Sequence, residues 1–94
     1  MDSGSGSAEF EVEASLLVNE GGVQCEAVVF ARPLRAPFLL PELGTDAFLG
    51  GARVARLDPG RAASRGAGLV AFVLEDPMDA RRFKAGDVVR LERN

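Results

Sequence analysis

Arginine side chains are the groups in this sequence that point most directly to ligand chemistry. A guanidinium group binds phosphate through its charge and its paired donors. The basic residues of the later part of the chain include Arg61, Arg65, Arg81, Arg82, Lys84, Arg90 and Arg93. Among them, Arg61, Arg65, Arg81 and Arg82 are the predicted phosphate- or RNA-binding residues. The pI of about 4.9 argues against a dedicated nucleic-acid binder, and no phenylalanine lies in a base-stacking motif.

The carboxylates Glu75, Asp76 and Asp79 form the densest acidic cluster. Their oxygens could bind a hard cation, but their spacing does not fit the twelve-residue calcium loop. Because a proline follows Asp76, the segment is more typical of a strand end, and the sequence predicts no metal site. The Arg-Gly-Ala-Gly segment at residues 65–68 could form an anion-binding nest, although a loop before a buried strand is the favoured interpretation.

The residue types that are absent exclude most catalytic machinery. The 94 residues include no His and one Cys, Cys25. A Ser-His-Asp triad, a Cys-His pair, an imidazole base, a Cys/His zinc site and an intrachain disulfide are therefore excluded. The lone lysine, Lys84, is followed by Ala85, so the phosphate-binding P-loop motif is excluded as well. We expect a protein that is not an enzyme and that needs no cofactor.

The net charge of −3 is distributed unevenly along the chain. Residues 1–31 carry six carboxylates and no basic side chain, whereas residues 32–94 carry eight carboxylates and all eleven basic side chains. The favoured interpretation is that the acids line the solvated face of two strands and the arginines are scattered for solubility. The functional alternative is a molecule that is acidic on one sheet and basic on another, each side facing a partner.

Residues 1–7, with the sequence MDSGSGS, are expected to form a flexible segment, so a single domain is assigned to residues 8–94. This segment lacks the basic and apolar regions of a signal peptide. No apolar run in the sequence approaches the roughly 20 residues of a membrane span. We expect a cytoplasmic protein with no membrane partner.

Alternating apolar residues predict the first two strands. In residues 8–18, one face of the expected strand carries Phe10, Val12, Ala14, Leu16 and Val18. The Asn-Glu-Gly-Gly sequence at 19–22 predicts a tight turn. Residues 23–30 alternate again, so the two strands are expected to pair antiparallel as a hairpin.

A proline-rich segment, residues 31–46, is expected to be extended and irregular. It is apolar, and its candidate partner-binding residues are Leu34, Phe38, Leu39 and Leu40. The favoured interpretation is that Phe38 with Leu39 or Leu40 fills an open end of a barrel or sandwich. The functional alternative is an exposed apolar docking loop.

Further strands and turns are expected along the rest of the chain. A short strand or turn at 48–51 precedes a strand at 52–57, in which Arg53 and Arg56 should face different sides. The Asp-Pro-Gly sequence at 58–60 predicts a turn, and residues 61–68 should be flexible. Residues 69–74 are apolar throughout, which predicts a central strand covered on both faces. One helical turn at 80–84 and a turn at 85–87 should precede a closing strand at 88–91, with Val89 and Leu91 on one side. Short strands without a long helical period predict an all-β fold, a small closed or nearly closed antiparallel β-barrel of about six strands.

The order of these features resembles the C-terminal β-barrel of elongation factor Tu and related translational GTPases over nearly all of residues 8–94. The matching features are the alternating acids of 9–14, Glu20-Gly21-Gly22, Arg32-Pro33 with Phe38, Asp58-Pro59-Gly60, the strand from Leu74 to Pro77, and Ala85-Gly86-Asp87 leading to Arg90-Leu91-Glu92. Val23 and Gln24 stand where that family has a basic residue near its tRNA-contacting surface, and the chain carries no GTP-binding domain. The resemblance implies a standalone barrel of this kind.

The function expected from these observations is that of a non-enzymatic module that binds a protein partner. One alternative is RNA or nucleotide binding through the arginine patch, which should weaken steeply as salt rises. Another is a self-assembling structural subunit, a homo-oligomer in which an edge strand pairs with a copy of itself.

Overall fold

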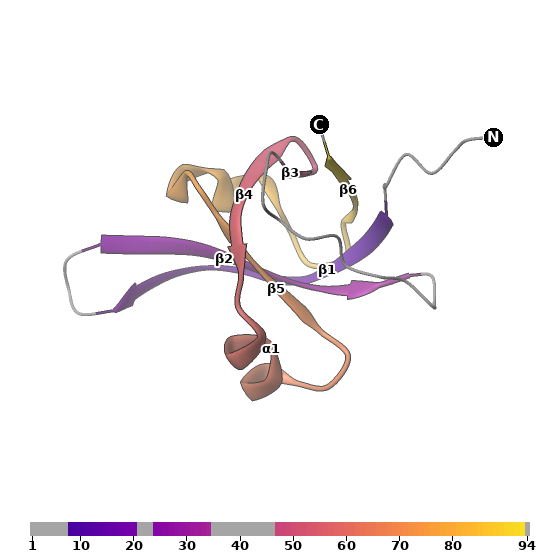
Figure 1. The fold of residues 1–94 in the computed structure, drawn as a ribbon, viewed down its shortest axis with the longest axis horizontal. Coiled ribbons are helices and arrows are strands. Elements are labelled where there is room, and N and C mark those ends of the chain that lie inside the picture. Colours follow the sequence, from indigo (N-terminus) through magenta and orange to yellow (C-terminus); the bar gives the residue numbers. More distant parts are fainter. Residues whose placement is uncertain (1–7, 21–23, 35–46, 94) are drawn as a thin grey trace.

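Six strands close into a barrel in the computed structural model, which describes residues 8–20, 24–34 and 47–93. The strands are β1 (Ala8–Glu20), β2 (Gln24–Pro33), β3 (Ala47–Leu49), β4 (Ala52–Leu57), β5 (Val70–Leu74) and β6 (Val88–Arg93). They follow the order β1-β2-β5-β4-β3-β6 around the barrel, and each neighbouring pair is antiparallel (Figure 1). The predicted fold class is confirmed.

The barrel interior is filled by apolar side chains from every strand. Phe10 of β1 and Phe72 of β5 are both fully buried, and their rings meet edge to face with centroids 5.1 Å apart, a favoured aromatic geometry. Leu91 of β6 is also fully buried, and Val89 packs against the same cluster. The predicted orientation of the closing strand is therefore confirmed.

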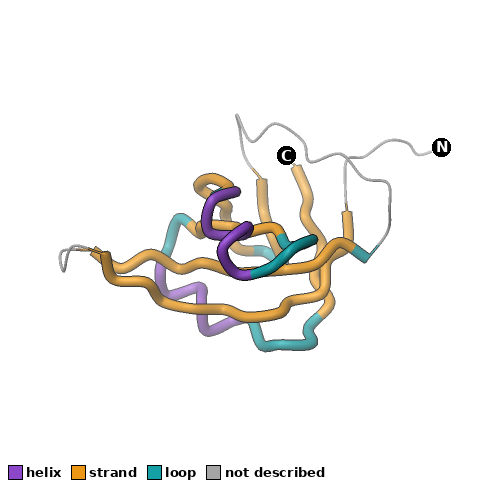
Figure 2. The backbone as a smooth tube through the Cα atoms, turned by 90° about the horizontal axis from the view of Figure 1, so that it is seen from below, coloured by secondary structure: helices purple, strands orange, loops and turns teal. Residues whose placement is uncertain are grey.

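A second apolar layer lies outside the barrel, under the helix α1 (Pro59–Arg65). Its buried residues are Val28, Phe30, Ala62, Ala71 and Val73. The helix lies across the outer surface of the strands (Figure 2). Strands β2 and β5 are consequently buried on both faces, which confirms the predicted central position of the 69–74 segment.

The expectation of a turn at 58–60 followed by a flexible segment is wrong, because α1 occupies residues 59–65. The side chain of Asp58 accepts a hydrogen bond from the backbone N–H of Arg61 at 3.1 Å, and Pro59 is the first helical residue. An acidic N-cap followed by proline starts a helix as readily as it makes a turn. Burial of Ala62 against the barrel then stabilises this short helix.

Strand β1 contains a bulge that overturns the predicted single apolar face. Val12 pairs with Ala31 and Ala14 pairs with Phe30, so Glu13 is an extra residue in β1. Before the bulge, Phe10 and Val12 point into the barrel. After it, Ala14 packs against the outer layer with Phe30 instead. The alternation in sequence is intact, but the extra residue moves the later apolar side chains to the opposite face.

A similar irregularity in β4 corrects the expected orientation of its arginines. Val54 pairs with Leu74 and Arg56 with Val73, so Ala55 is the additional residue. Because Val73 belongs to the outer layer, Arg56 lies on the outer face of the barrel. Arg53, whose neighbours in sequence Ala52 and Val54 are buried in the interior, faces outward too. The two side chains therefore share a face, contrary to the prediction.

Beyond the barrel wall, the ends of β1 and β2 project as a two-stranded arm (Figure 1). We call this the arm, residues 16–20 of β1 and 24–26 of β2. Strand β2 pairs with β5 only from Ala27 onward, so residues 24–26 of β2 and residues 18–20 of β1 opposite them have no third strand beside them among the described residues. The antiparallel hairpin is as predicted, although β2 continues to Pro33 through residues that were expected to be irregular.

One end of the barrel is covered by the 3₁₀ helix η1 (Pro77–Arg82). Ala80 of η1 and Phe83 beyond it are buried in the interior cluster. The hydroxyl of Ser15 in β1 donates to the carbonyl oxygen of Ala80 at 2.7 Å, which fixes η1 to the inner face of β1. The helical turn was expected at 80–84 and begins earlier, at Pro77 behind the N-cap Asp76. Phe38, Leu39 and Leu40, expected to fill a barrel end, lie outside the described residues.

Candidate functional site

Four charged side chains from three elements form a closed network beside α1. Glu26 of β2 accepts hydrogen bonds from Arg56 at 2.8 Å and from Arg61 at 2.9 Å. Each arginine also lies 3.5 Å from the Asp58 carboxylate. Two arginines and two carboxylates thus alternate around a ring with no net charge. The network links β2, β4 and α1, and it provides the Arg61 guanidinium with carboxylate partners from the same molecule.

The network also holds its two carboxylates in the ionised form. The hydrogen bond from Arg61, reinforced by that from Arg56, lowers the pKa of Glu26 below its ordinary value. The backbone N–H of Arg61 lowers the pKa of Asp58, and the charges of Arg61 and Arg56 act in the same direction. With these lowered pKa values both carboxyl groups stay ionised at neutral pH, whereas a carboxyl group that acts as a general acid there requires a raised pKa.

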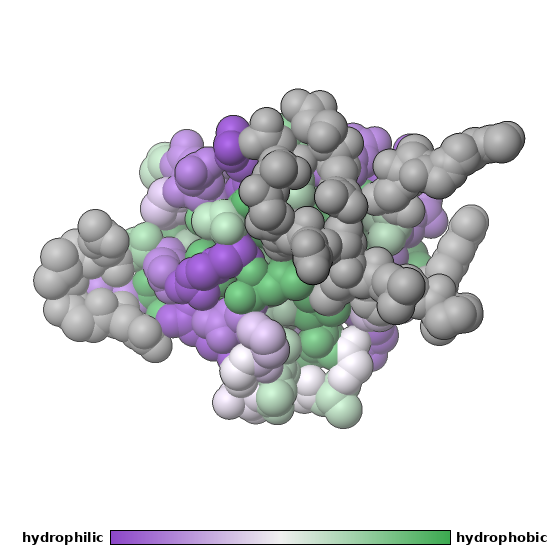
Figure 3. Space-filling view, in the orientation of Figure 1, coloured by the Kyte–Doolittle hydropathy of each residue, from purple (hydrophilic) through white to green (hydrophobic). Residues whose placement is uncertain are grey.

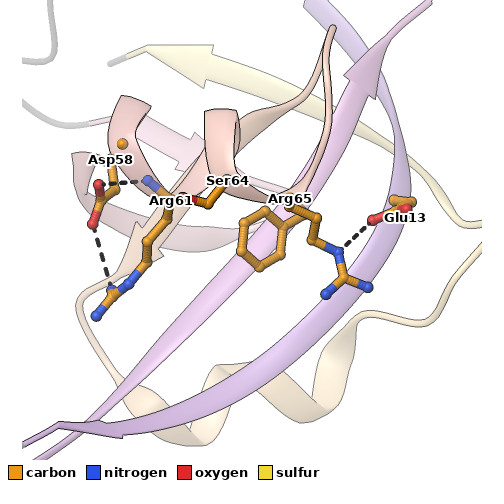
Figure 4. A pocket seen from close by; sticks show the side chains of 7 residues that line it. Glu13, Asp58, Arg61, Ser64 and Arg65 are labelled. Atoms are coloured by element: carbon orange, nitrogen blue, oxygen red, sulfur yellow. Dashed lines mark hydrogen bonds and ion pairs between the residues drawn. The ribbon is translucent and has the colours of Figure 1, made fainter.

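A shallow pocket of about 710 Å³ lies next to this network. Its lining includes Asp58, Arg61, Ser64 and Arg65 from the α1 region, with Phe30 and Glu13 from the strands (Figure 4). Arg65 Nε donates to Glu13 Oε1 at 2.8 Å, and its guanidinium carbon lies 5.0 Å from the centre of the Phe30 ring. The arginine is held by an ion pair and a cation–π contact, and the residue it binds is the extra residue of the β1 bulge.

The structure does not bring the predicted phosphate-binding arginines together. Arg61 and Arg65 lie on α1, whereas Arg81 and Arg82 lie on η1 at the barrel end (Figure 2). Arg82 contacts the Asp79 carboxylate at 3.7 Å and donates to the Gly50 carbonyl at 3.3 Å. Arg81 is exposed and has no ion pair within the described part of the chain.

The acidic cluster at 75–79 has structural roles. Glu75 pairs with Arg53 at 2.9 Å, and Asp76 caps η1 by accepting from the Met78 backbone N–H at 3.0 Å. Asp79 faces Arg82. Within residues 8–20, 24–34 and 47–93, no group of three or more potential metal ligands is found.

The functional alternative of an acidic side opposite a basic side is not found among the described residues. Glu9 lies 3.5 Å from Arg90, Glu13 pairs with Arg65, and Glu26 pairs with Arg56 and Arg61. Barrel closure places β1 beside β6, and α1 lies over β2 and β5 with Arg65 reaching Glu13 of β1, so the early acids meet the late arginines. Hydrophilic and apolar residues are also interspersed on the face shown in Figure 3.

Of the predicted partner-binding residues, only Leu34 belongs to the described part of the chain. Its side chain is 44% exposed, and its backbone N–H donates to Glu9 at 3.0 Å. Phe38, Leu39 and Leu40 lie outside the described residues. Their role as a docking loop stays a prediction.

The arm is a candidate surface that the sequence reasoning missed. Leu16 is 40% exposed and Leu17 is 58% exposed, although both lie within a regular strand. Two adjacent leucines in a strand place one apolar side chain on each face. The adjacent leucines were the signal in the sequence, because when one of the two side chains faces the buried side of the sheet, the other must face the opposite side.

Comparisons with known proteins give no relative: no family model matches the chain, and neither characterised proteins nor solved structures show a significant match. A six-stranded barrel hosts many functions, so the fold by itself does not identify an elongation factor Tu-like domain. No helix in the described part of the chain is long and apolar enough to span a bilayer.

Proposed function

We propose that this chain is a non-enzymatic protein-binding module and that the arm is its binding surface. The observation that carries the proposal is a projecting strand, β1, with exposed apolar side chains and a backbone edge that no strand of the described residues occupies. Leu17 is more than half exposed, and β1 pairs with β6 only from Ala8 to Glu11. Exposed strand edges recruit other chains by strand addition, with main-chain hydrogen bonds supplying affinity.

The polar groups of the described residues support a non-enzymatic role. No polar or charged side chain among them is buried, so none is held in a dry environment that would tune its reactivity. The two carboxylates with lowered pKa values, Glu26 and Asp58, serve an ion-pair network and a helix cap. The proposal retains the resemblance to the elongation factor Tu barrel as a likeness of fold and includes Leu34 as a secondary contact.

RNA or nucleotide binding is less well supported than protein binding. Three of the four candidate arginines, Arg61, Arg65 and Arg82, are engaged by carboxylates of the same molecule. A phosphate ligand would have to compete with these pairs for the guanidinium groups. If RNA does bind, affinity should fall steeply with salt, whereas docking on the arm should change little.

Site-specific photo-crosslinking tests the proposed surface. A photoreactive amino acid replaces Leu17 in one protein and Val88 in another, because these side chains are 58% and 60% exposed and differ in location. We expect covalent protein adducts from position 17, formed with either another protein or a second copy, and few from position 88. Unlabelled wild-type chain should compete with these adducts, and the Leu17→Glu chain should not. Equal labelling at both positions would refute the arm as the binding surface.

A further inference from the structure

Among the described residues, no strand pairs with one edge of β1 beyond Val12, and the backbone groups along this edge can be assigned. Val12 donates to the Asp87 carbonyl at 2.7 Å and accepts from the Gly86 N–H at 2.8 Å, so the Val12 backbone faces away from β2. Because Glu13 is the extra residue of the bulge, Ala14 faces β2 opposite Phe30. Backbone direction alternates along a strand. The N–H and C=O groups of Ser15, Leu17 and Asn19 therefore point toward the open edge.

The open stretch runs from Ala14, just past the groups that bind Val12, to Glu20 at the end of β1. At about 3.3 Å per residue these seven residues span roughly 23 Å. Leu17 is at the centre of the stretch. A second copy of this stretch that runs antiparallel can therefore pair with all seven residues only when its Leu17 lies opposite Leu17 of the first copy.

We propose that β1 of one molecule pairs antiparallel with β1 of a second copy along this edge, with the two-fold axis at Leu17. This inference rests on the proposed protein-binding function and names the partner for the same surface. Closure by a two-fold axis satisfies the β1 edges of both molecules at once. The result is a continuous four-stranded ribbon in the order β2-β1-β1-β2.

The side chains and charges suit this register. Leu16 faces Val18 of the second copy, and Ser15 faces its Asn19. Residues 15–19 carry no charged side chain, so no like charges, which would destabilise the pair, are directly opposed along this stretch. The outward groups of Ser15, Leu17 and Asn19 provide about six backbone hydrogen bonds between the molecules. Burial of Leu16 and Leu17, 40% and 58% exposed in the monomer, adds an apolar contribution.

A single strand pair is a small interface, so the dimer should dissociate on dilution. Sedimentation of the purified full-length chain across a dilution series should show a mass approaching twice 9.9 kDa at high concentration and the monomer mass at low concentration. Leu17→Lys places two ammonium groups at the two-fold axis and should remove the dimer. Val88→Lys, at a side chain of similar exposure, should leave it unchanged.

Disulfide crosslinking tests the register in a Cys25→Ser background, with far-UV circular dichroism confirming that each variant is folded. Leu17→Cys should give a covalent dimer on mild oxidation, because directly paired Cα atoms lie about 5.5 Å apart and disulfides span roughly that distance. Asn19→Cys should not, since four residues along the strand separate the two sulfurs by about 13 Å. Crosslinking at 19 but not at 17 would overturn the register.

The two proposals can fail separately. A wild-type chain that stays monomeric at all concentrations overturns the second-copy partner. If position 17 then still crosslinks to a different protein, the module function stands with another occupant. If position 17 labels nothing in preference to position 88, both proposals fail. If the Leu17→Lys chain still forms the dimer, the open edge of β1 is not the dimer interface.

Discussion

The two apolar layers of this protein predict that neighbouring valines on opposite faces of β2 contribute equally to stability. Val29 lies in the barrel interior, whereas Val28 lies in the outer layer under α1, and both side chains are fully buried. In a simple barrel, one face of a strand is solvated, and only Val29 would matter. Substituting each by alanine therefore measures whether α1 is an integral part of the folded domain.

The magnitude follows from burial. Val→Ala removes two carbon atoms, worth about 1.6 kcal/mol at roughly 0.8 kcal/mol per buried methylene. The cavity left behind adds to this loss, so each substitution should cost about 2–3 kcal/mol. For a domain whose total stability is on the order of 5–15 kcal/mol, this is a large fraction. Val88→Ala, at a side chain 60% exposed, should change stability by less than about 0.5 kcal/mol.

Urea unfolding provides the assay. The chain contains no Trp and no Tyr, so far-UV circular dichroism is the suitable signal. With an m-value of about 1 kcal/mol/M, the midpoint should fall by about 2–3 M for both Val28→Ala and Val29→Ala, with m unchanged. If Val29→Ala shows this loss and Val28→Ala behaves like Val88→Ala, α1 does not cover β2 and the account of the outer layer is refuted.

Three further predictions follow from individual contacts. Because the pKa of Glu26 is lowered in the folded protein, its contribution to stability is fully present above its ordinary pKa of 4.5 and is lost as pH falls through the lower folded-state pKa. The urea midpoint of the Glu26→Gln chain should therefore decrease less between neutral and acid pH than that of the wild-type chain. Arg65→Ala should cost about 0.5–1 kcal/mol by loss of its exposed ion pair and its cation–π contact with Phe30, and Arg65→Ala in a Phe30→Leu background should cost measurably less. Gly50 and Gly86 both have positive φ angles, 57° and 96°, but a Cβ added at Gly50 would meet Phe83 at 3.1 Å, whereas one added at Gly86 would meet open space. Gly50→Ala should therefore lower the thermal unfolding midpoint more than Gly86→Ala does.

The strands along the chain were largely predictable because period-two alternation is a local property of sequence, whereas their order around the barrel was not predicted beyond the first hairpin. The 52–57 strand and the all-apolar 69–74 strand correspond closely to β4 and β5. The bulge in β1 was not predictable, since it depends on how Val12 and Ala14 align with residues of β2. One extra residue, Glu13, leaves the alternation in sequence intact and reverses its meaning in space.

The short helix was also missed, for a physical reason. Seven residues, Pro59–Arg65, are too few to show a helical period, and an isolated helix of that length is not stable in water. Its start signals, Asp58 and Pro59, were present but equally compatible with a turn. Packing of Ala62 on the outer face of β2 and β5 decides between the two, and that information is not local.

The charge pattern shows why site prediction from arginines was less successful than fold prediction. Ion pairs such as Arg90 with Glu9 and Arg65 with Glu13 join residues more than fifty positions apart in sequence. Their formation requires the barrel to close first, so an arginine-rich sequence cannot reveal which guanidinium groups are already occupied. In the folded chain the acids of the first two strands serve as internal partners for the later arginines, and the chain-wide asymmetry does not become a surface asymmetry.

This internal neutralisation changes which surface remains to be explained. Closing the barrel pairs the strand edges of β3, β4, β5 and β6, and the ion pairs engage most of the arginines around it. The exceptions in the described chain are the length of β1 beyond Val12, where the strand outruns β6, and residues 24–26 of β2, which β5 does not reach. A barrel strand needs to extend only as far as its neighbours for closure, so the additional residues of β1 and β2 contribute little to the interior. Their length, exposed leucines and open backbone edge are accounted for if another chain completes the pairing.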